Sequence, residues 1–219
     1  MNLEATFREA LATLDLAPAP DLTDEQINHL LGYVDLMARW NKTYNLTAVR
    51  DPQEMLRLHL LDSLVVRAPL WRHLGDQAAS VLDVGSGGGL PGVVLAVTMP
   101  QLDVTCVDAV AKKTAFVRQV AAELKLPNLR AEHARVETLP SKPWPVITSR
   151  AFASLLDFVS LTRGLLAPDG VWMAMKGKVP DEEIAALPSD VEVFHVEHLQ
   201  VPGLDAERCL VWMRRLQHA

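Results

Sequence analysis

The sequence predicts an α/β fold in which a helical N-terminal extension precedes a largely parallel sheet. Three observations support this prediction. Residues 80–92 have the pattern of a short buried strand, a glycine-rich turn and the start of a helix. After this stretch, apolar strand patterns alternate with helical patterns, which is typical of a parallel sheet covered on both faces. Before it, apolar residues recur only at helical spacing.

The N-terminal extension is expected to contain three helices. The first runs from Glu4 to Leu14, and the second begins at a capping box formed by Thr23 and Gln26. A polar loop is expected from Asn41 to Asp51. The third helix then runs from Pro52 to Val66, because proline is favoured in the first turn and the apolar positions continue at helical spacing. We assign residues 1–75 to this extension and residues 76–219 to the sheet domain.

The sheet domain is expected to contain seven strands. They are Val81–Val84, Asp103–Asp108, Leu129–Glu132, Val146–Ser149, Val171–Lys176, Val191–Glu197 and Leu210–Arg214. Helices are expected from Pro91 and over Lys112–Leu124, Ser154–Leu165 and Asp181–Leu187, with a turn at Pro168–Gly170. The last two strands have no helix between them, so we expect them to form an antiparallel pair at the sheet edge.

Composition narrows the class of protein. Of 219 residues, 49% are hydrophobic, so a sizeable core is available, but no run reaches the roughly 18 apolar residues of a membrane span. The first residues carry acids where a signal peptide carries basic residues. Cys106 and Cys209 are far apart and fit reduced thiols of the cytoplasm. The net charge of −6 argues against a generally basic nucleic-acid binder, although residues 39–72 hold six basic and three acidic side chains.

The glycine turn indicates the kind of ligand. Its spacing places Asp83 at the end of a strand, followed by Gly85, Gly87 and Gly89. A carboxylate in the turn repels a diphosphate but suits a cationic ligand, and S-adenosylmethionine carries an ammonium and a sulfonium without any phosphate. The alternative is that Asp83 caps the helix and the glycines form a purely structural turn.

Other candidate ligands follow the later strands, whose carboxyl ends share one edge of the sheet. Asp108 ends the second strand and is expected to accept hydrogen bonds from ribose hydroxyls, or else to cap the next helix. Arg135 to Glu137 follow the third strand, where an adenine ring is expected. Arg150 and Lys176 end the fourth and fifth strands and are expected to position ligands.

Several chemistries lack their usual residues. The fourth strand ends in Ser149-Arg150-Ala151, without the Asn/Asp-Pro-Pro-aromatic turn that holds an exocyclic amine for methylation. Neither cysteine stands beside a proline at a strand end, as a cysteine nucleophile for a pyrimidine would. No spacing of His, Cys or Asp suggests a metal site, and His59 and Asp62, one helical turn apart, are more often a structural pair.

A set of motifs carries a family resemblance. It comprises residues 45–52 (NLTAVRDP), His59-x-x-Asp62-Ser63-Leu64, residues 83–92 (DVGSGGGLPG), residues 149–153 (SRAFA) and Lys176-Gly177. In this order the set closely resembles the bacterial 16S ribosomal RNA guanine-N7 methyltransferase family, once called glucose-inhibited division protein B. The resemblance implies a class I methyltransferase fold, S-adenosylmethionine as methyl donor with S-adenosylhomocysteine as product, and a guanine of the small subunit as target. It also implies a cofactor site lined by Gly85, Leu90, Val136, Glu137 and Arg150.

The resemblance also implies an RNA-contacting face on the extension. Candidate RNA contacts are Asn45, Arg50, Arg57, His59 and Lys176. Many members of the family carry Arg-His in the third helix, whereas here Leu58 precedes His59, and this shift rotates Arg57 by about 100° around the helix. We expect the protein to be a cytoplasmic monomer that does not associate with a membrane. Its expected partner is 16S rRNA, within the small subunit or an assembly intermediate.

Guanine N7 has a lone pair and no proton, so its methylation needs alignment of the reacting atoms and no general base. Three rivals remain. They are a small-molecule methyltransferase, an NAD-dependent oxidoreductase, which the glycine register disfavours, and a non-catalytic RNA-binding factor. The sequence leaves the target nucleotide and the assembly state of the RNA open.

Overall fold

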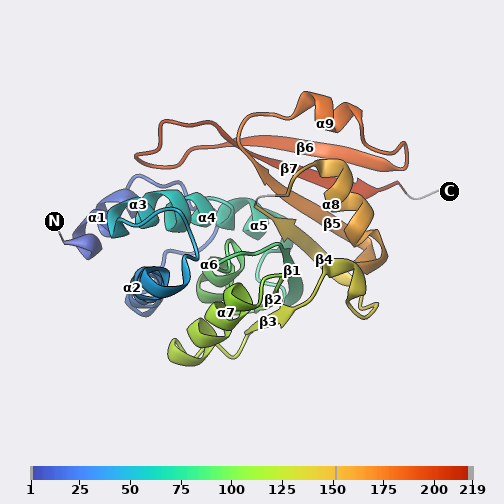
Figure 1. Ribbon diagram of the computed structural model, residues 1–219. Helices are drawn as coiled ribbons and strands as arrows, with labels where there is room; N and C mark the ends of the chain where they lie inside the picture. Colours follow the sequence, from blue (N-terminus) through green and yellow to red (C-terminus); the bar gives the residue numbers. More distant parts are fainter. Residues whose placement is uncertain (1, 151, 217–219) are drawn as a thin grey trace.

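A seven-stranded sheet forms the centre of the computed structural model, which describes residues 2–150 and 152–216. The strand order is β3-β2-β1-β4-β5-β7-β6 (Figure 1). The strands are β1 (Ala79–Val84), β2 (Leu102–Asp108), β3 (Leu129–His133), β4 (Trp144–Ser149), β5 (Leu166–Lys176), β6 (Val191–Leu199) and β7 (Arg208–Arg215). Strands β1 to β5 pair in parallel, and β7 pairs antiparallel with both β5 and β6. This arrangement confirms the predicted α/β fold and the antiparallel pair at its edge.

Helices cover both faces of the sheet. One face carries α1 (Leu3–Leu11), α2 (Asp24–Tyr44), α3 (Pro52–Met55), η1 (Leu56–Leu61), α4 (Asp62–Leu64), α5 (Arg67–Leu74), α6 (Gly92–Thr98) and α7 (Ala111–Glu123). The other carries η2 (Val136–Thr138), α8 (Leu155–Thr162), η3 (Arg163–Leu165) and α9 (Asp181–Ala185). Within the described part of the chain, no helix has the length and apolar content needed to cross a membrane.

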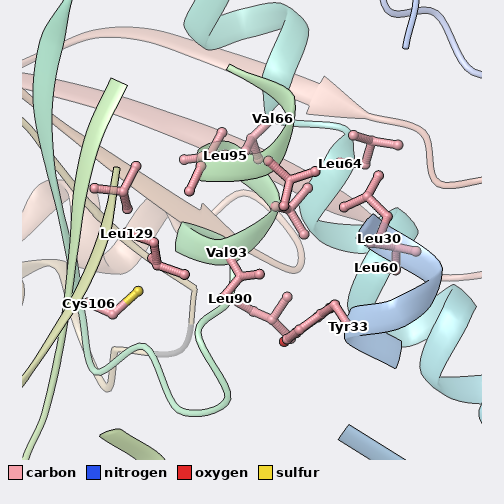
Figure 2. Close-up of a cluster of buried hydrophobic side chains, with 14 of the residues drawn as sticks. Leu30, Tyr33, Leu60, Leu64, Val66, Leu90, Val93, Leu95, Cys106 and Leu129 are labelled. Carbon is pink, nitrogen blue, oxygen red and sulfur yellow. The ribbon is translucent and has the colours of Figure 1, made fainter. Parts of the chain in front are cut away.

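The helices of the N-terminal extension share one hydrophobic core with the sheet. Figure 2 shows Leu30 and Tyr33 of α2 and Leu60 of η1 beside Val93 and Leu95 of α6. All five side chains are fully buried. The same cluster continues to the side chains of the central strands. The boundary between residues 75 and 76 stays a prediction, and it passes between elements that are packed together.

Helix α2 is longer than the sequence suggests. A loop was expected from Asn41 to Asp51, but the helix continues to Tyr44. The reason is the buried side chain of Asn41, which donates to the Val49 carbonyl oxygen at 2.8 Å and accepts from the Thr47 amide at 2.9 Å. A polar residue that looked like part of a loop therefore fastens the following loop to the helix.

The predicted third helix, Pro52 to Val66, is divided into α3, η1 and α4, and a separate helix, α5, follows it. The middle segment η1 is a π-helix, and the amide of Asp62 bonds back to the carbonyl of Arg57, five residues earlier. Such wider turns occur frequently at functional sites. The spacing of apolar residues does not reveal a short π-helix, because the π-helix inserts one residue and the apolar stripe continues after it.

Strand β5 begins before the predicted turn at Pro168–Gly170. It runs from Leu166, and its pairing with β4 is irregular between Trp144 and Val146. A Cβ on Gly170 would lie 2.8 Å from the Trp144 carbonyl oxygen, so glycine allows the two strands to approach there. The predicted turn residues 168–170 therefore lie within the irregular first part of β5 and do not form a separate turn.

Candidate active site

The glycine turn after β1 leaves its backbone open to a ligand. Gly85 has a φ of 66°, a conformation that glycine adopts readily, and a Cβ built there would meet no atom within 4 Å. The amides of Gly85 and Ser86 both donate to the Val107 carbonyl, and the Tyr33 hydroxyl of α2 donates to the Gly88 carbonyl at 2.8 Å. Neighbouring elements therefore hold the turn, while one side of it faces open space.

Asp83 points away from that open space. It is fully buried, and its Oδ2 accepts a hydrogen bond from the Gly92 amide at 2.8 Å. Burial raises the pKa of Asp83 to about 7, although the hydrogen bond from Gly92 opposes the shift. Asp83 lines neither pocket described below, so it acts under the turn by fixing the start of α6. The structure does not support the expected direct contact with a cationic ligand.

Two pockets meet at Gly85. The first, called here the α8-side pocket, has a volume of about 270 Å³. Its walls come from the ends of β1 and β2, the segment after β3 and helix α8. The lining residues are Val84, Gly85, Val107, Asp108, Ala109, Ala134, Arg135, Val136, Glu137, Phe152 and Leu161. Apolar walls beside a carboxylate fit a flat ring attached to a hydroxylated sugar.

The second, called here the α2-side pocket, has a volume of about 170 Å³. It lies on the other side of the glycine turn, between α2, η1 and the start of α7. The lining residues are Met37, Leu46, Thr47, His59, Gly85, Ser86, Gly87, Gly88, Leu90, Lys113 and Arg150. The charged side chains that line it, Lys113 and Arg150, are both basic, and no carboxylate is among its described lining residues.

Asp108, the last residue of β2, binds the backbone of the glycine turn that follows β1. Its Oδ2 accepts from the Gly87 amide at 2.9 Å and its Oδ1 accepts from the Val110 amide at 2.8 Å. The Lys113 ammonium lies 3.8 Å from Oδ2. Asp108 is largely buried and yet lines the α8-side pocket. Asp108 is not the N-cap of α7, whose N-cap residue is Val110, although it holds the Val110 amide just before that helix. A carboxylate that holds backbone amides still presents lone pairs to a pocket, so the predicted contact with a ribose stays compatible with this geometry.

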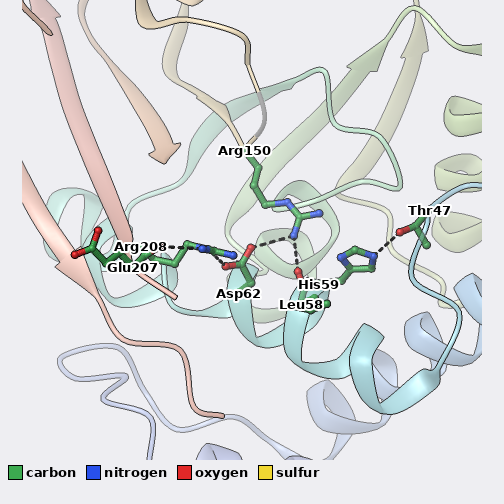
Figure 3. Close-up of polar contacts among 7 residues, drawn as sticks. All are labelled: Thr47, Leu58, His59, Asp62, Arg150, Glu207 and Arg208. Atoms are coloured by element: carbon green, nitrogen blue, oxygen red, sulfur yellow. Dashed lines mark hydrogen bonds and ion pairs between the residues drawn. The ribbon is translucent and has the colours of Figure 1, made fainter. Parts of the chain in front are cut away.

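Arg150 is held by groups far away in the sequence (Figure 3). Its Nη1 donates to the Leu58 carbonyl of η1 at 3.1 Å and to Asp62 Oδ2 at 3.2 Å. The other oxygen of Asp62 accepts from Arg208 Nε, at 2.5 Å. Asp62 is therefore paired with two guanidinium groups. Ala151, which follows Arg150 in the motif, lies outside the described residues.

His59 lies beside this group and lines the α2-side pocket. One ring nitrogen, Nε2, is 2.8 Å from the Thr47 hydroxyl, and the other, Nδ1, is buried without a hydrogen-bond partner among the described residues (Figure 3). Burial and the positive charge of Arg150 lower the pKa of His59. The imidazole is therefore neutral at pH 7.

Comparison with known proteins decides the family. The family described as rRNA small subunit methyltransferase G matches this chain over residues 26–211. The ribosomal RNA small subunit methyltransferase G of Methylibium petroleiphilum is 63% identical over 195 residues, which cover 89% of this chain and 88% of that protein. The protein of the same name from Leptothrix cholodnii is 64% identical over 193 residues, covering 88% of each. The chain belongs to the rRNA small subunit methyltransferase G family.

This membership confirms the resemblance found in the sequence. A solved S-adenosylmethionine-dependent methyltransferase from Aquifex aeolicus shares the fold, with a TM-score of 0.52 and 17% identity over 74% of this chain and 93% of that one. The predicted class I methyltransferase fold is therefore also confirmed.

In this member of the methyltransferase G family, most residues predicted for the cofactor surround the two pockets. Gly85 borders both pockets, and Val136 and Glu137 line the α8-side pocket. Gly87, Leu90 and Arg150 line the α2-side pocket. Gly89 does not line either one. A Cβ there would lie 2.5 Å from a methyl carbon of Val93, so Gly89 allows α6 to pack closely against the turn.

Lys176 is not brought to either pocket. Its ammonium binds both carboxylate oxygens of Glu183 in α9, at 3.0 and 2.7 Å, and approaches the Phe152 carbonyl at 3.4 Å. Glu183 in turn accepts from the Leu155 amide at 2.7 Å. Lys176 therefore joins α8, α9 and β5, and the geometry does not support its expected role in positioning ligands or binding RNA.

Of the other candidate RNA contacts, Asn45 and Arg50 lie near the α2-side pocket, whereas Arg57 does not. Asn45 and Arg50 are exposed and joined by a hydrogen bond of 3.0 Å, next to the loop residues that line the α2-side pocket. Arg57 is exposed but packs its side chain against Gly203, away from both pockets. The one-residue shift noted in the sequence thus corresponds to an arginine that faces the loop before β7.

Sequence reasoning did not assign several lining residues to the site. They include Met37 of α2, Leu46 and Thr47 of the following loop, Lys113 of α7, and Leu161 of α8. Leu46 and Thr47 had an available signal, since they belong to the NLTAVRDP motif, and Lys113 had a weaker one, since it lies in the helix that follows the second strand. The others reach the site because helices pack across the strand ends, and no local pattern encodes that contact.

Proposed function

We propose that this chain transfers a methyl group from S-adenosylmethionine to N7 of a guanine in 16S ribosomal RNA. The observation that carries the proposal is the meeting of two pockets at Gly85, in a member of the rRNA small subunit methyltransferase G family. One pocket suits a nucleoside and the other is basic, so a donor and an RNA acceptor can approach the same point from opposite sides.

The α8-side pocket is the proposed place of the adenosine part of the cofactor. Asp108 would accept from the ribose hydroxyls, and Val136 and Phe152 would contact the adenine ring. Gly85 fits this use, because the open space at its missing Cβ allows a ligand to reach the backbone. When bound, S-adenosylmethionine supplies a methyl group on a positively charged sulfur.

The α2-side pocket is the proposed place of the acceptor base. Its ionisable side chains are Lys113, Arg150 and a neutral His59. Asp62, the nearest carboxylate to Arg150, is already paired with two arginines. A pocket whose described residues offer no free carboxylate is suited to an acceptor that loses no proton, and guanine N7 is such an acceptor. Acceleration would come from alignment of the reacting groups.

The exposed side chains beside the acceptor pocket are the proposed RNA contacts. Asn45 and Arg50 stand in the loop after α2, and Lys112 at the start of α7 donates to the Tyr44 carbonyl at 2.8 Å. They would bind phosphates around an unpaired base, which is the usual form in which RNA sequence is read. We propose that the extension, residues 1–75, supplies this face, and that the chain acts as a cytoplasmic monomer.

Transfer of a labelled methyl group tests the proposal. The purified protein, with labelled S-adenosylmethionine, is incubated with small ribosomal subunits and with naked 16S rRNA from cells that lack this protein. We expect one labelled guanine, whose N7 modification is located by chemical cleavage and mass spectrometry. Label on another atom would contradict the N7 proposal, and label only on small molecules would favour the rival small-molecule methyltransferase.

A second measurement separates the remaining rivals. Calorimetric titration with S-adenosylhomocysteine and with NADH should show binding of the first alone. Binding of NADH would favour an oxidoreductase. A protein that binds ribosomal RNA but neither S-adenosylhomocysteine nor NADH would be a non-catalytic binding factor.

A further inference from the structure

The ion cluster around Asp62 has a composition that neither fold stability nor catalysis by Asp62 explains. Asp62 is 4% exposed and stands where η1 passes into α4, and its two oxygens accept from Arg150 and from Arg208. Arg150 follows β4, and Arg208 begins β7. One buried carboxylate therefore joins three elements that are far apart in the sequence. A buried ion pair adds little stability relative to apolar residues of similar volume, and in some proteins such a pair serves to fix geometry.

The cluster leaves one side of Arg150 available. Its Nη1 is used by Leu58 and Asp62, whereas no hydrogen bond within the described part of the chain uses its Nε or Nη2. The side chain of Arg150 is 22% exposed and lines the α2-side pocket. A guanidinium presents its donors in a planar fork that matches an oxyanion.

The charge of the cluster favours the same ligand. Two guanidinium groups face one carboxylate, so the group keeps one positive charge in excess. Arg208 is important for this excess, because without it Asp62 would neutralise Arg150 alone. Lys113 adds a further ammonium to the same pocket. An arginine that is held in place before binding loses less side-chain entropy when the ligand arrives.

We infer that Asp62 and Arg208 are positioning residues, which hold the free edge of Arg150 toward the α2-side pocket so that it binds an oxyanion. The oxyanion is either the carboxylate of the cofactor's methionine part or a phosphate of the RNA, and the inference rests on the proposed function for these two sources. Asp62 itself contacts neither ligand, since both of its oxygens are occupied by arginines.

Asp62→Asn tests the inference, because asparagine keeps the shape but loses the charge-assisted hydrogen bonds that hold Arg150 and Arg208. The change makes the cluster more positive, so a loss of oxyanion affinity reports lost positioning of Arg150 and not lost attraction. Three dissociation constants are measured, for S-adenosylhomocysteine, for 5′-methylthioadenosine, which lacks the carboxylate, and for 16S rRNA with saturating S-adenosylhomocysteine. If the cofactor carboxylate is bound, the affinity for S-adenosylhomocysteine falls by about tenfold or more while that for methylthioadenosine is unchanged. If a phosphate is bound, only RNA affinity falls, and its salt dependence loses about one unit of slope.

Other variants keep the test decisive. Arg208→Gln should reduce affinity for the same ligand by a smaller factor, Arg208→Lys should restore most of it, and Arg150→Gln combined with Asp62→Asn should add little to the loss. Arg163→Gln removes a comparable pair with Asp190 outside the two pockets and should change none of the three constants.

The inference is overturned if Asp62→Asn and Arg208→Gln leave all three constants unchanged. It is equally overturned if they weaken all three ligands alike together with a lower melting temperature. Binding of S-adenosylhomocysteine and 5′-methylthioadenosine does not depend on which RNA atom is methylated. The two dissociation constants therefore test this inference even if the proposed function is wrong.

Discussion

Two carboxylates at neighbouring strand ends have different tasks because their side chains point to different places. Asp83 is fully buried and holds the amide of Gly92 under the turn. Asp108 holds the amides of Gly87 and Val110 and still lines a pocket. The first carboxylate fixes a helix to the sheet, and the second connects the turn with a ligand site.

Asp83→Asn should make the protein less sensitive to pH. Burial raises the folded-state pKa of Asp83 from its ordinary 3.8 to about 7. The folded state therefore binds a proton more tightly than the unfolded state, and stability falls as the pH rises from about 4 to about 7. The cost of ionisation above pH 7 is on the order of 4 kcal/mol. The amide of asparagine avoids this cost and still accepts from Gly92.

Urea unfolding at pH 5 and pH 8 measures this effect. The free energy of unfolding of the variant, relative to the natural protein, should be about 2–3 kcal/mol more favourable at pH 8 than at pH 5, because part of the ionisation cost is already present at pH 5. Asp76→Asn, in the exposed loop before β1, is the control and should show no such difference. An equal effect of Asp83→Asn at both pH values would show that the buried carboxyl does not titrate in this range.

His59→Gln should retain most of the methyl transfer. The lowered pKa of His59 leaves the ring neutral above about pH 6.5, and N7 has no proton to remove. The single-turnover rate should therefore be nearly flat between about pH 6.5 and about pH 9. Rapid-quench measurement of labelled RNA follows this rate. His133→Gln, an exposed histidine, is the matched control. A steep pH dependence that His59→Gln abolishes would instead identify His59 as a general base.

At the scale of elements, the start of α6 decides how the turn is placed. A Cβ on Gly92 would lie 2.5 Å from Cys106 Sγ and 2.8 Å from Asp83 Oδ2. Only glycine lets the helix begin this close to β1 and β2. The same turn is bonded from the opposite side by Tyr33 of α2, so the pocket shared at Gly85 depends on two helices as well as on two strands.

Gly92→Ala should therefore destabilise the protein by about 1–3 kcal/mol through overpacking. Chemical denaturation gives the change in the free energy of unfolding, and cofactor affinity should fall with it because the turn must move. Gly164→Ala is the matched control, since a Cβ at Gly164 meets no atom within 4 Å, and its effect should stay within about 0.5 kcal/mol. Equal stability of the two variants would mean that the helix can shift without cost.

The sequence predicts the elements well and the directions of side chains less well. The seven strands, the glycine turn and the antiparallel edge follow from apolar patterns, and strand ends correctly mark the edge of the sheet that holds the pockets. The same rule placed Lys176 correctly at the end of β5 but did not predict its contacts, because Glu183 of the next helix binds its ammonium. It also could not foresee the cluster of Asp62 and Arg208, since ion pairs across 146 residues leave no local pattern.

At the scale of the whole molecule, the extension and the sheet share one hydrophobic core. The buried cluster that includes Leu30, Leu60 and Val66 continues into Val93 and Leu129 without a break (Figure 2). Polar contacts accompany this apolar packing, since Arg67 of α5 donates to the Thr98 carbonyl and Gln26 of α2 donates to the Val97 carbonyl of α6. An extension that merely added an RNA-binding face would not need to bury its apolar side chains in the core of the sheet.

The full chain should therefore unfold in one cooperative transition. Variants that retain a single tryptophan, Trp40 in α2 or Trp172 in β5, report separately on the extension and the sheet. Their fluorescence midpoints in urea should coincide with each other and with the loss of circular dichroism. Two separate midpoints would mean that residues 1–75 and 76–219 fold independently.

The shared core has a consequence during protein synthesis. Helices α1 to α5 leave the ribosome first, but their apolar faces find their partners only when α6 and α7, which end at Glu123, have emerged. At bacterial rates of roughly 5–20 residues per second, the nascent chain exposes these faces to the surrounding solution for several seconds. A chaperone that binds apolar segments near the ribosome exit is thus expected to meet this chain early, before the enzyme has formed any site for its own ribosomal substrate.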